Sequence, residues 1–148
     1  MELFYKVENL MDKKPVILYA EDDFDDFESL RDAILQLTDE FELIQAKNGT
    51  EVVSQLENEM ADQHPCVIIL DLNMPIMNGK EVLTWLKKDD RFSEIPVMIF
   101  TTSSREEDLK LCQMHKCTFF RKPTLYRDLL HIAQTMLDMC DGKGVYNT

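Results

Sequence analysis

Four apolar segments of the chain end in carboxylate, hydroxyl or ammonium side chains, which are groups that bind metal ions or take part in group transfer. The side chains are those of Asp22, Asp23, Asp71, Thr101 and Lys122. The clearest case is the segment 66–70, Cys-Val-Ile-Ile-Leu, which Asp71 follows directly. A fully apolar run of strand length is typical of a strand buried on both faces of a parallel sheet. Because open α/β sheets place ligands at the carboxyl ends of their strands, Asp71 is the first candidate for a functional residue.

These side chains would lie close together, because the carboxyl ends of parallel strands share one edge of a sheet. Three carboxylates brought together repel one another, and Mg²⁺, which prefers oxygen ligands and uses one or two carboxylates, would supply a counter-charge. Lys122 would add a point cation. With this charge balance one aspartate could attack phosphorus and form an acyl phosphate, while the Thr101 hydroxyl donates to a phosphoryl oxygen. The residues therefore predict phosphoryl transfer to an aspartate.

Apolar runs that alternate with amphipathic segments predict five strands and five helices. The expected strands cover 16–20, 41–46, 66–70, 96–100 and 117–120. The apolar positions of the expected helices lie within 27–37, 52–60, 82–86 and 125–137, and one more helix begins near Arg105. Strict alternation predicts right-handed βαβ units, and hence an α/β protein with a doubly wound parallel sheet and helices on both faces. The polar run 101–104 offers N-cap side chains for the helix that begins near Arg105.

The composition fits one globular domain, with 148 residues of which 45% are hydrophobic. The formal net charge of −12 argues against binding to nucleic acid, because phosphate backbones need clustered Lys and Arg side chains. This charge favours a carboxylate-rich site or partners with basic surfaces. No apolar run reaches the length of a membrane span, and the first residues lack the pattern of a signal peptide.

The cysteines show neither a Cys-x-x-Cys pair nor the spacing of metal ligands. They are Cys66, Cys112, Cys117 and Cys140. We interpret them as free thiols in a reducing compartment and expect a cytoplasmic protein. The globular domain is expected over residues 15–140, after a loose N-terminal extension over 1–14 and before a C-terminal tail over 141–148. Met11 could be the native start.

Taken together, the polar segments resemble the receiver domain of the two-component response regulators, from about Val16 to Leu137. The matching segments are Glu21-Asp22-Asp23, Asp71-Leu72-Asn73-Met74-Pro75, Asn78-Gly79, Thr101-Thr102-Ser103 and Lys122-Pro123. Each segment alone is a weak signal, but their order, each after a strand, is specific. The resemblance implies a stand-alone receiver with the flavodoxin-like fold of chemotaxis regulators and a strand order of 2-1-3-4-5. A narrower likeness points to the phytochrome-associated branch.

The resemblance also implies roles for individual residues. Asp71 would accept the phosphoryl group, and Lys122 would pair with that group or with Asp71, just before a cis peptide bond to Pro123. On phosphorylation Thr101 would move toward the new oxygens, and Phe119 would rotate into the space left behind. This switch would change the surface that partners bind.

For the metal, the resemblance implies that Asp23, Asp71 and the backbone carbonyl of Asn73 bind Mg²⁺ directly. Asp22 would act mainly through a bridging water.

Such a receiver would take its phosphoryl group from a sensor histidine kinase and would act through contact with a histidine phosphotransferase or a target protein. It would be a signalling switch rather than an enzyme, with only self-phosphorylation and self-dephosphorylation chemistry, and neither nucleic acid nor membrane is expected as a partner. A phosphohydrolase is an alternative, but such enzymes usually carry a second acid where this chain has Asn73. A phosphorylation-independent adaptor is another alternative, although the complete set of site residues argues against it.

Overall fold

The computed structural model describes residues 13–103 and 105–142, which form helices around a sheet of five parallel strands. The strands are β1 (Val16–Ala20), β2 (Glu42–Ala46), β3 (Val67–Leu70), β4 (Val97–Thr101) and β5 (Thr118–Arg121). The helices are α2 (Phe24–Leu37), α3 (Gly49–Glu57), α4 (Gly79–Lys88), α5 (Glu106–Met114) and α6 (Tyr126–Cys140). The strands lie in the order β2-β1-β3-β4-β5. The predicted doubly wound, flavodoxin-like α/β sheet is therefore confirmed.

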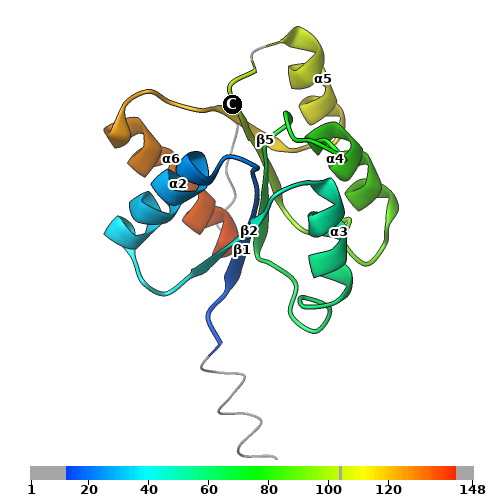
Figure 1. The fold of residues 1–148 in the computed structure, drawn as a ribbon, viewed down its shortest axis with the longest axis horizontal. Helices are drawn as coiled ribbons and strands as arrows, with labels where there is room; N and C mark the ends of the chain where they lie inside the picture. The colour runs from blue at the N-terminus through cyan, green and yellow to red at the C-terminus, as the bar shows by residue number, and fades with distance from the viewer. Residues whose placement is uncertain (1–12, 104, 143–148) are drawn as a thin grey trace, which may run out of the picture.

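The helices cover both faces of the sheet, with α2 and α6 on one face and α3, α4 and α5 on the other (Figure 1). Successive side chains of a strand point to opposite faces. In β1, Ile17 and Tyr19 therefore pack in the core under α2 and α6, whereas Leu18 and Ala20 pack in the core under α3 and α4. Because both faces are covered, the central strands β1 and β3 are buried along their whole length, whereas the edge strands β2 and β5 also carry polar residues.

The strands β1 and β3 end side by side, because Ala20 pairs with Leu70 in their parallel register. The residues that follow are Glu21 and Asp71, and the Asp71 N–H donates to the Ala20 carbonyl at 3.0 Å. Two carboxyl groups that are fifty residues apart in the sequence are thus brought to the same edge of the sheet.

The strands β4 and β5 bring two further functional candidates to this edge. Thr101, the last residue of β4, pairs with Arg121, the last residue of β5. Lys122 follows directly, and its N–H donates to the Thr101 carbonyl at 2.8 Å. The sheet register therefore places Thr101 and Lys122 beside Asp71.

The start of α5 differs from the expectation of a capped helix. Its N-cap residue is Arg105, which makes no side-chain cap hydrogen bond. The Ser103 hydroxyl, expected as a cap, donates instead to Asp108 Oδ2 at 2.5 Å. A carboxylate in the first turn of α5 therefore holds the hydroxyl that was expected to cap the helix.

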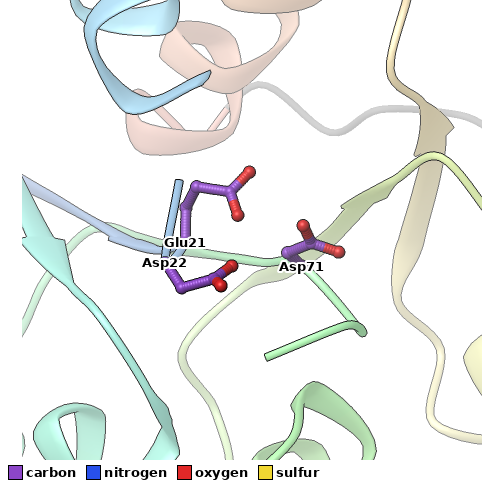
Figure 2. Close-up of side chains that lie close together, drawn as sticks. All are labelled: Glu21, Asp22 and Asp71. Atoms are coloured by element: carbon purple, nitrogen blue, oxygen red, sulfur yellow. The ribbon is translucent and has the colours of Figure 1, made fainter. Parts of the chain in front are cut away.

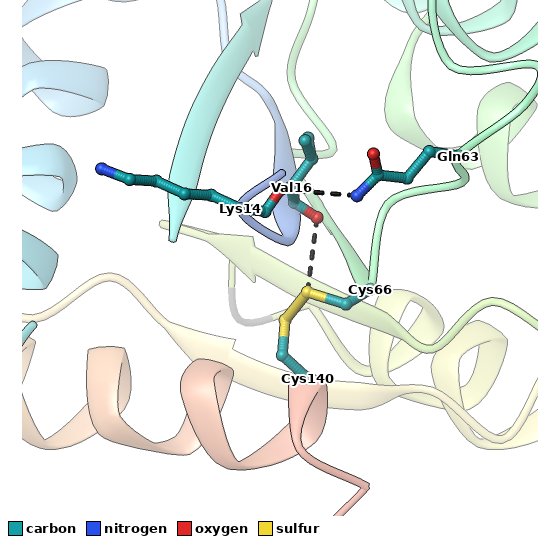
Figure 3. The surroundings of a disulfide bond; sticks show 5 residues. All are labelled: Lys14, Val16, Gln63, Cys66 and Cys140. Carbon is teal, nitrogen blue, oxygen red and sulfur yellow. Dashed lines mark hydrogen bonds between the residues drawn. A yellow bond between two sulfur atoms is a disulfide. The ribbon is translucent and has the colours of Figure 1, made fainter. Parts of the chain in front are cut away.

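A disulfide joins Cys66, just before β3, to Cys140 at the end of α6 (Figure 3). The prediction of free thiols is therefore wrong for these two residues, whereas Cys112 and Cys117 are free. The error has a physical reason: the two cysteines are 74 residues apart in sequence, and only the packing of α6 against the sheet brings their Cα atoms to 4.8 Å. Because two of the four cysteines are paired, the cysteines no longer favour a reducing compartment.

The predicted N-terminal extension 1–14 and C-terminal tail 141–148 lie outside the described residues, except for 13–14 and 141–142. Among the helices of the described residues, none is both long and apolar enough to cross a membrane.

Candidate functional site

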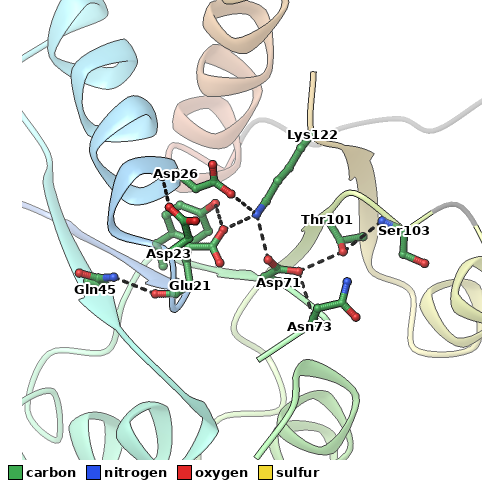
Figure 4. Close-up of polar contacts among 10 residues, drawn as sticks. Glu21, Asp23, Asp26, Gln45, Asp71, Asn73, Thr101, Ser103 and Lys122 are labelled. Carbon is green, nitrogen blue, oxygen red and sulfur yellow. Dashed lines mark hydrogen bonds and ion pairs between the residues drawn. The ribbon is translucent and has the colours of Figure 1, made fainter. Parts of the chain in front are cut away.

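Asp71 is buried at the carboxyl edge of the sheet, and both of its carboxylate oxygens accept hydrogen bonds (Figure 4). Oδ1 accepts from the Thr101 hydroxyl at 3.0 Å and from the Asn73 N–H at 3.1 Å. Oδ2 accepts from the Lys122 ammonium at 2.9 Å. Three donors from three segments therefore fix the position of one carboxylate.

Lys122 lies among three carboxyl groups, since its ammonium also donates to Glu21 Oε1 and, at 2.7 Å, to Asp26 Oδ2. Its side chain is only 12% exposed. Burial alone would lower the pKa of Lys122, but the hydrogen bonds to Asp26, Glu21 and Asp71 outweigh burial and raise this pKa above its ordinary value. The ammonium is thus charged at any physiological pH.

Glu21 is a buried acid that the neighbouring groups do not fully compensate. Burial raises the pKa of Glu21 to about 8, and the nearby Asp71 charge adds to this, although the hydrogen bond from Lys122 acts in the opposite direction. The Tyr19 hydroxyl, which is buried beneath the site, donates to Glu21 Oε1 at 3.3 Å. The negative charge of the site is therefore not fully balanced, and one more positive charge would be favourable there.

Glu21, Asp22 and Asp71 form a cluster whose carboxylate oxygens lie within 4.8 Å of one another (Figure 2). Glu21 and Asp71 are buried, whereas Asp22 is exposed. A cluster of oxygen donors with one open side fits Mg²⁺, which uses few carboxylates and keeps several waters. A divalent cation here would also offset the Asp71 charge, which adds to the effect of burial on the pKa of Glu21.

Asp23, the predicted direct ligand, is not part of this carboxylate cluster. It is the N-cap of α2, and its Oδ1 accepts from the Asp26 N–H at 3.0 Å. Asn73 follows Asp71 closely and directs its N–H to the Asp71 carboxylate. Glu21 and Asp22 therefore lie beside Asp71, whereas the sequence analysis assigned this position to Asp22 and Asp23.

The two predicted switch residues lie on adjacent strands. Thr101 is fully buried. Phe119 of β5 is half-buried and packs against the core that α3, α4 and α5 cover. The peptide bond between Lys122 and Pro123 is trans, so the expected cis bond is wrong.

The turn after Asp71 brings the chain back against the site. Ile76 has a left-handed backbone with φ of 69°, which is strained for a β-branched residue. Gly79 begins α4, and a Cβ atom there would lie 2.2 Å from the Asp71 carbonyl oxygen. Only glycine lets the first turn of α4 approach the end of β3 this closely.

The arrangement brings together the parts that phosphoryl transfer needs. The Asp71 carboxylate could serve as an oxygen nucleophile, Lys122 and Thr101 are donors that could contact phosphoryl oxygens, and the carboxylate cluster could hold a divalent cation.

Fold and site together define a class of protein. Residues 17–134 match the response regulator receiver domain, and the chain therefore belongs to this family.

Individual members of the family are similar over most of the chain. The response regulator Rcp1 of Synechocystis sp. is 30% identical over 123 residues, which cover 80% of this chain and 84% of Rcp1. The structure of the phosphorylated cyanobacterial phytochrome response regulator RcpA superposes with a TM-score of 0.78 at 25% identity, covering 92% of this chain and all of RcpA. The Mn²⁺-bound form of Rcp1 superposes with a TM-score of 0.76 at 27% identity, covering 90% of this chain and 99% of Rcp1.

Sequence reasoning missed several residues that contact the site. Glu21 belonged to the quoted acidic motif but was given no role, and Asp26, in the first turn of α2, was not among the candidate residues. Its pKa is lowered, because its hydrogen bond and charge interaction with Lys122 outweigh the cost of burial. A carboxylate before a helix N-cap, followed by another in its first turn, is the signal that could have found them.

Proposed function

We propose that this chain is a response regulator receiver that accepts a phosphoryl group on Asp71 from the phosphohistidine of a sensor histidine kinase. The observation that carries the proposal is the environment of the Asp71 carboxylate, which accepts from Thr101 on one oxygen and from Lys122 on the other. In the reaction, a bond forms between a carboxylate oxygen of Asp71 and phosphorus. The bond between phosphorus and the imidazole nitrogen of the donor breaks, and that nitrogen keeps the electron pair.

Mg²⁺ would be held by Asp22 and Asp71, with Glu21 beside them and the Asn73 carbonyl as a further oxygen ligand. When bound, the ion supplies positive charge against the phosphoryl oxygens. The carboxylate cluster and the Mn²⁺-bound form of the relative Rcp1 support this assignment. Lys122 would contribute the second positive charge, and Thr101 would donate its hydroxyl to a phosphoryl oxygen.

The output of this protein would be a change in partner binding. The Thr101 hydroxyl would leave Asp71 for the phosphoryl group, and Phe119, half-buried on the neighbouring strand, would follow. A histidine phosphotransferase or a target protein would bind the altered surface, and the chain would act as a switch without turning over a substrate of its own. The likeness to the phytochrome response regulators RcpA and Rcp1 supports a place in such a pathway.

Intact-mass spectrometry after incubation with acetyl phosphate and Mg²⁺ tests the proposal. We expect one phosphoryl adduct that requires Mg²⁺ and is absent from Asp71→Asn. Asp128→Asn, which changes an exposed aspartate of α6, is the matched control and keeps the adduct. An adduct that survives Asp71→Asn would overturn the assignment of the acceptor. Absence of any adduct in the native chain would favour the phosphorylation-independent adaptor.

A further inference from the structure

Asp108, in the first turn of α5, is a fully buried carboxylate that the proposed phosphoryl transfer does not use. Three side chains surround it. The Ser103 hydroxyl donates to Oδ2 at 2.5 Å, the Lys80 ammonium lies 2.8 Å from Oδ1, and the Arg105 Nε lies 3.4 Å from Oδ2. A buried charge of this kind is retained only with such partners, because an unpaired one is costly.

Ser103 connects Asp108 to the acceptor site. Its N–H donates to the Thr101 hydroxyl oxygen at 3.4 Å, and the Thr101 hydroxyl donates to Asp71 Oδ1 at 3.0 Å (Figure 4). A hydroxyl has one proton and two lone pairs. When its oxygen accepts from Ser103, its proton is directed toward Asp71. The position of Ser103 therefore determines where Thr101 aims its donor.

Lys80 connects Asp108 to the other side of Asp71. It follows Gly79, where an added Cβ atom would lie 2.2 Å from the Asp71 carbonyl oxygen and whose N–H donates to the Leu72 carbonyl at 3.2 Å. Asp108 thus holds one residue next to the start of α4 and another next to Thr101. The two segments that flank the Asp71 carboxylate meet at a single buried charge.

We propose that Asp108 is a positioning residue for phosphoryl transfer: through Ser103 it sets the orientation of the Thr101 hydroxyl, and through Lys80 it holds α4 against Asp71. This inference rests on the proposed function and adds a residue to that site. Asparagine has the shape of aspartate but lacks the charge that holds Lys80 and Arg105, and its single acceptor oxygen cannot serve both Ser103 and Lys80. Asp108→Asn therefore removes the positioning and little volume.

The kinetic test compares native protein, Asp108→Asn, Thr101→Ala and the double variant, with acetyl phosphate as donor. At saturating Mg²⁺, we expect Asp108→Asn to slow adduct formation about tenfold, the scale of a small misplacement of a reacting group, without changing the Mg²⁺ concentration that gives half the maximal rate. In the Thr101→Ala background the same substitution should have a clearly smaller effect, because the route through Ser103 has lost its target and only the contact with Lys80 remains. Glu106→Gln, an exposed neighbour in the same helical turn, is the control and keeps the native rate.

A second readout needs no phosphoryl transfer and separates this inference from the proposed function. The NMR resonance of the Thr101 methyl group should shift in Asp108→Asn and in Ser103→Ala, but not in Glu106→Gln. An unshifted Thr101 resonance, or a loss of rate that persists undiminished in the Thr101→Ala background, would overturn the positioning role. If the native chain forms no adduct, the proposed function fails, and the Thr101 resonance still decides whether Asp108 orients that hydroxyl.

Discussion

Asp22 and Asp23 are neighbours in the sequence but have different surroundings at the end of β1. Asp22 shares a carboxylate cluster with Glu21 and Asp71, whereas Asp23 caps α2 through the Asp26 N–H. Asparagine caps a helix about as well as aspartate does. The pair therefore offers two substitutions of equal size, one in the carboxylate cluster and one beside it.

We expect Mg²⁺ to stabilise the native chain, since a ligand that binds only the folded state at about 100 times its Kd adds about 2.7 kcal/mol to the free energy of unfolding. For a chain of this length the melting temperature would rise by roughly 5 to 10 °C. Asp22→Asn should remove most of this rise, and Asp23→Asn should keep it. Thermal unfolding with and without Mg²⁺ measures both. The reverse result would return Asp23 to the metal and move Asp22 out of it.

The difference between these residues shows what an apolar pattern can predict. It locates the ends of β1 and β3 well enough to bring Asp71, Thr101 and Lys122 together, because strand ends in a parallel sheet share an edge. The apolar pattern does not predict which of the acidic residues after the end of β1 lies beside Asp71. Glu21 is 1% exposed, and its charge alone set it apart from the buried strand that it continues. The sheet register, and not the composition, places Glu21 opposite Asp71.

At the scale of the helices, the close approach of α4 to β3 depends on Gly79. We expect Gly79→Ala to lower the free energy of unfolding by about 2–3 kcal/mol, because the added Cβ would overlap backbone atoms that cannot move away. Urea denaturation measures the loss.

Gly142→Ala is the control for a backbone effect alone. Gly142 has φ of 74°, but a Cβ atom there would meet nothing within 4 Å. Its replacement should cost about 1 kcal/mol, the penalty of a left-handed backbone for a residue with a Cβ atom. Equal losses in the two variants would mean that α4 does not depend on the close approach at Gly79.

The Asp108 carboxylate of α5 forms an ion pair with Lys80 of α4, and the charge of this carboxylate depends on pH. Burial alone would raise the pKa of Asp108, but the ion pair with Lys80 and the hydrogen bond from Ser103 outweigh burial and hold this pKa below its ordinary value of 3.8. A lowered pKa in the folded state means that the stabilisation is present above about pH 4 and is lost as the pH falls through the folded pKa. At neutral pH, the free energy of unfolding of the native protein should therefore exceed that of Asp108→Asn.

As the pH is lowered from about 6 to about 3, the difference between native protein and Asp108→Asn should shrink. Urea denaturation of both proteins across this range measures it. A difference that stays constant with pH would show that the carboxylate charge contributes nothing, and that Asp108 acts through its shape alone.

At the scale of the whole molecule, the disulfide ties the last helix to the beginning of a central strand. Cross-linking residues 74 apart restricts the unfolded chain, and in the chain-entropy description this adds about 4 kcal/mol to the free energy of unfolding. We expect Cys140→Ser to lower stability by an amount of this order while leaving adduct formation at Asp71 intact, since Cys66 and Asp71 lie at opposite ends of β3.

Thiol titration of the denatured protein checks the pairing directly. Without reductant two thiols should react, those of Cys112 and Cys117, and after reduction all four. Four reactive thiols without reductant would contradict the disulfide. No pattern in the sequence predicts this bond, because the spacing of Cys66 and Cys140 follows from the packing of α6 and not from any local motif.

The same bond closes a covalent ring that contains Asp71, Thr101 and Lys122 but leaves out Glu21 and Asp22. A protease that cuts once between residues 66 and 140 would therefore not release a fragment. The nicked protein would migrate as one species on a gel without reductant and as two with it, and Asp71, Thr101 and Lys122 would stay tethered to each other after the cut.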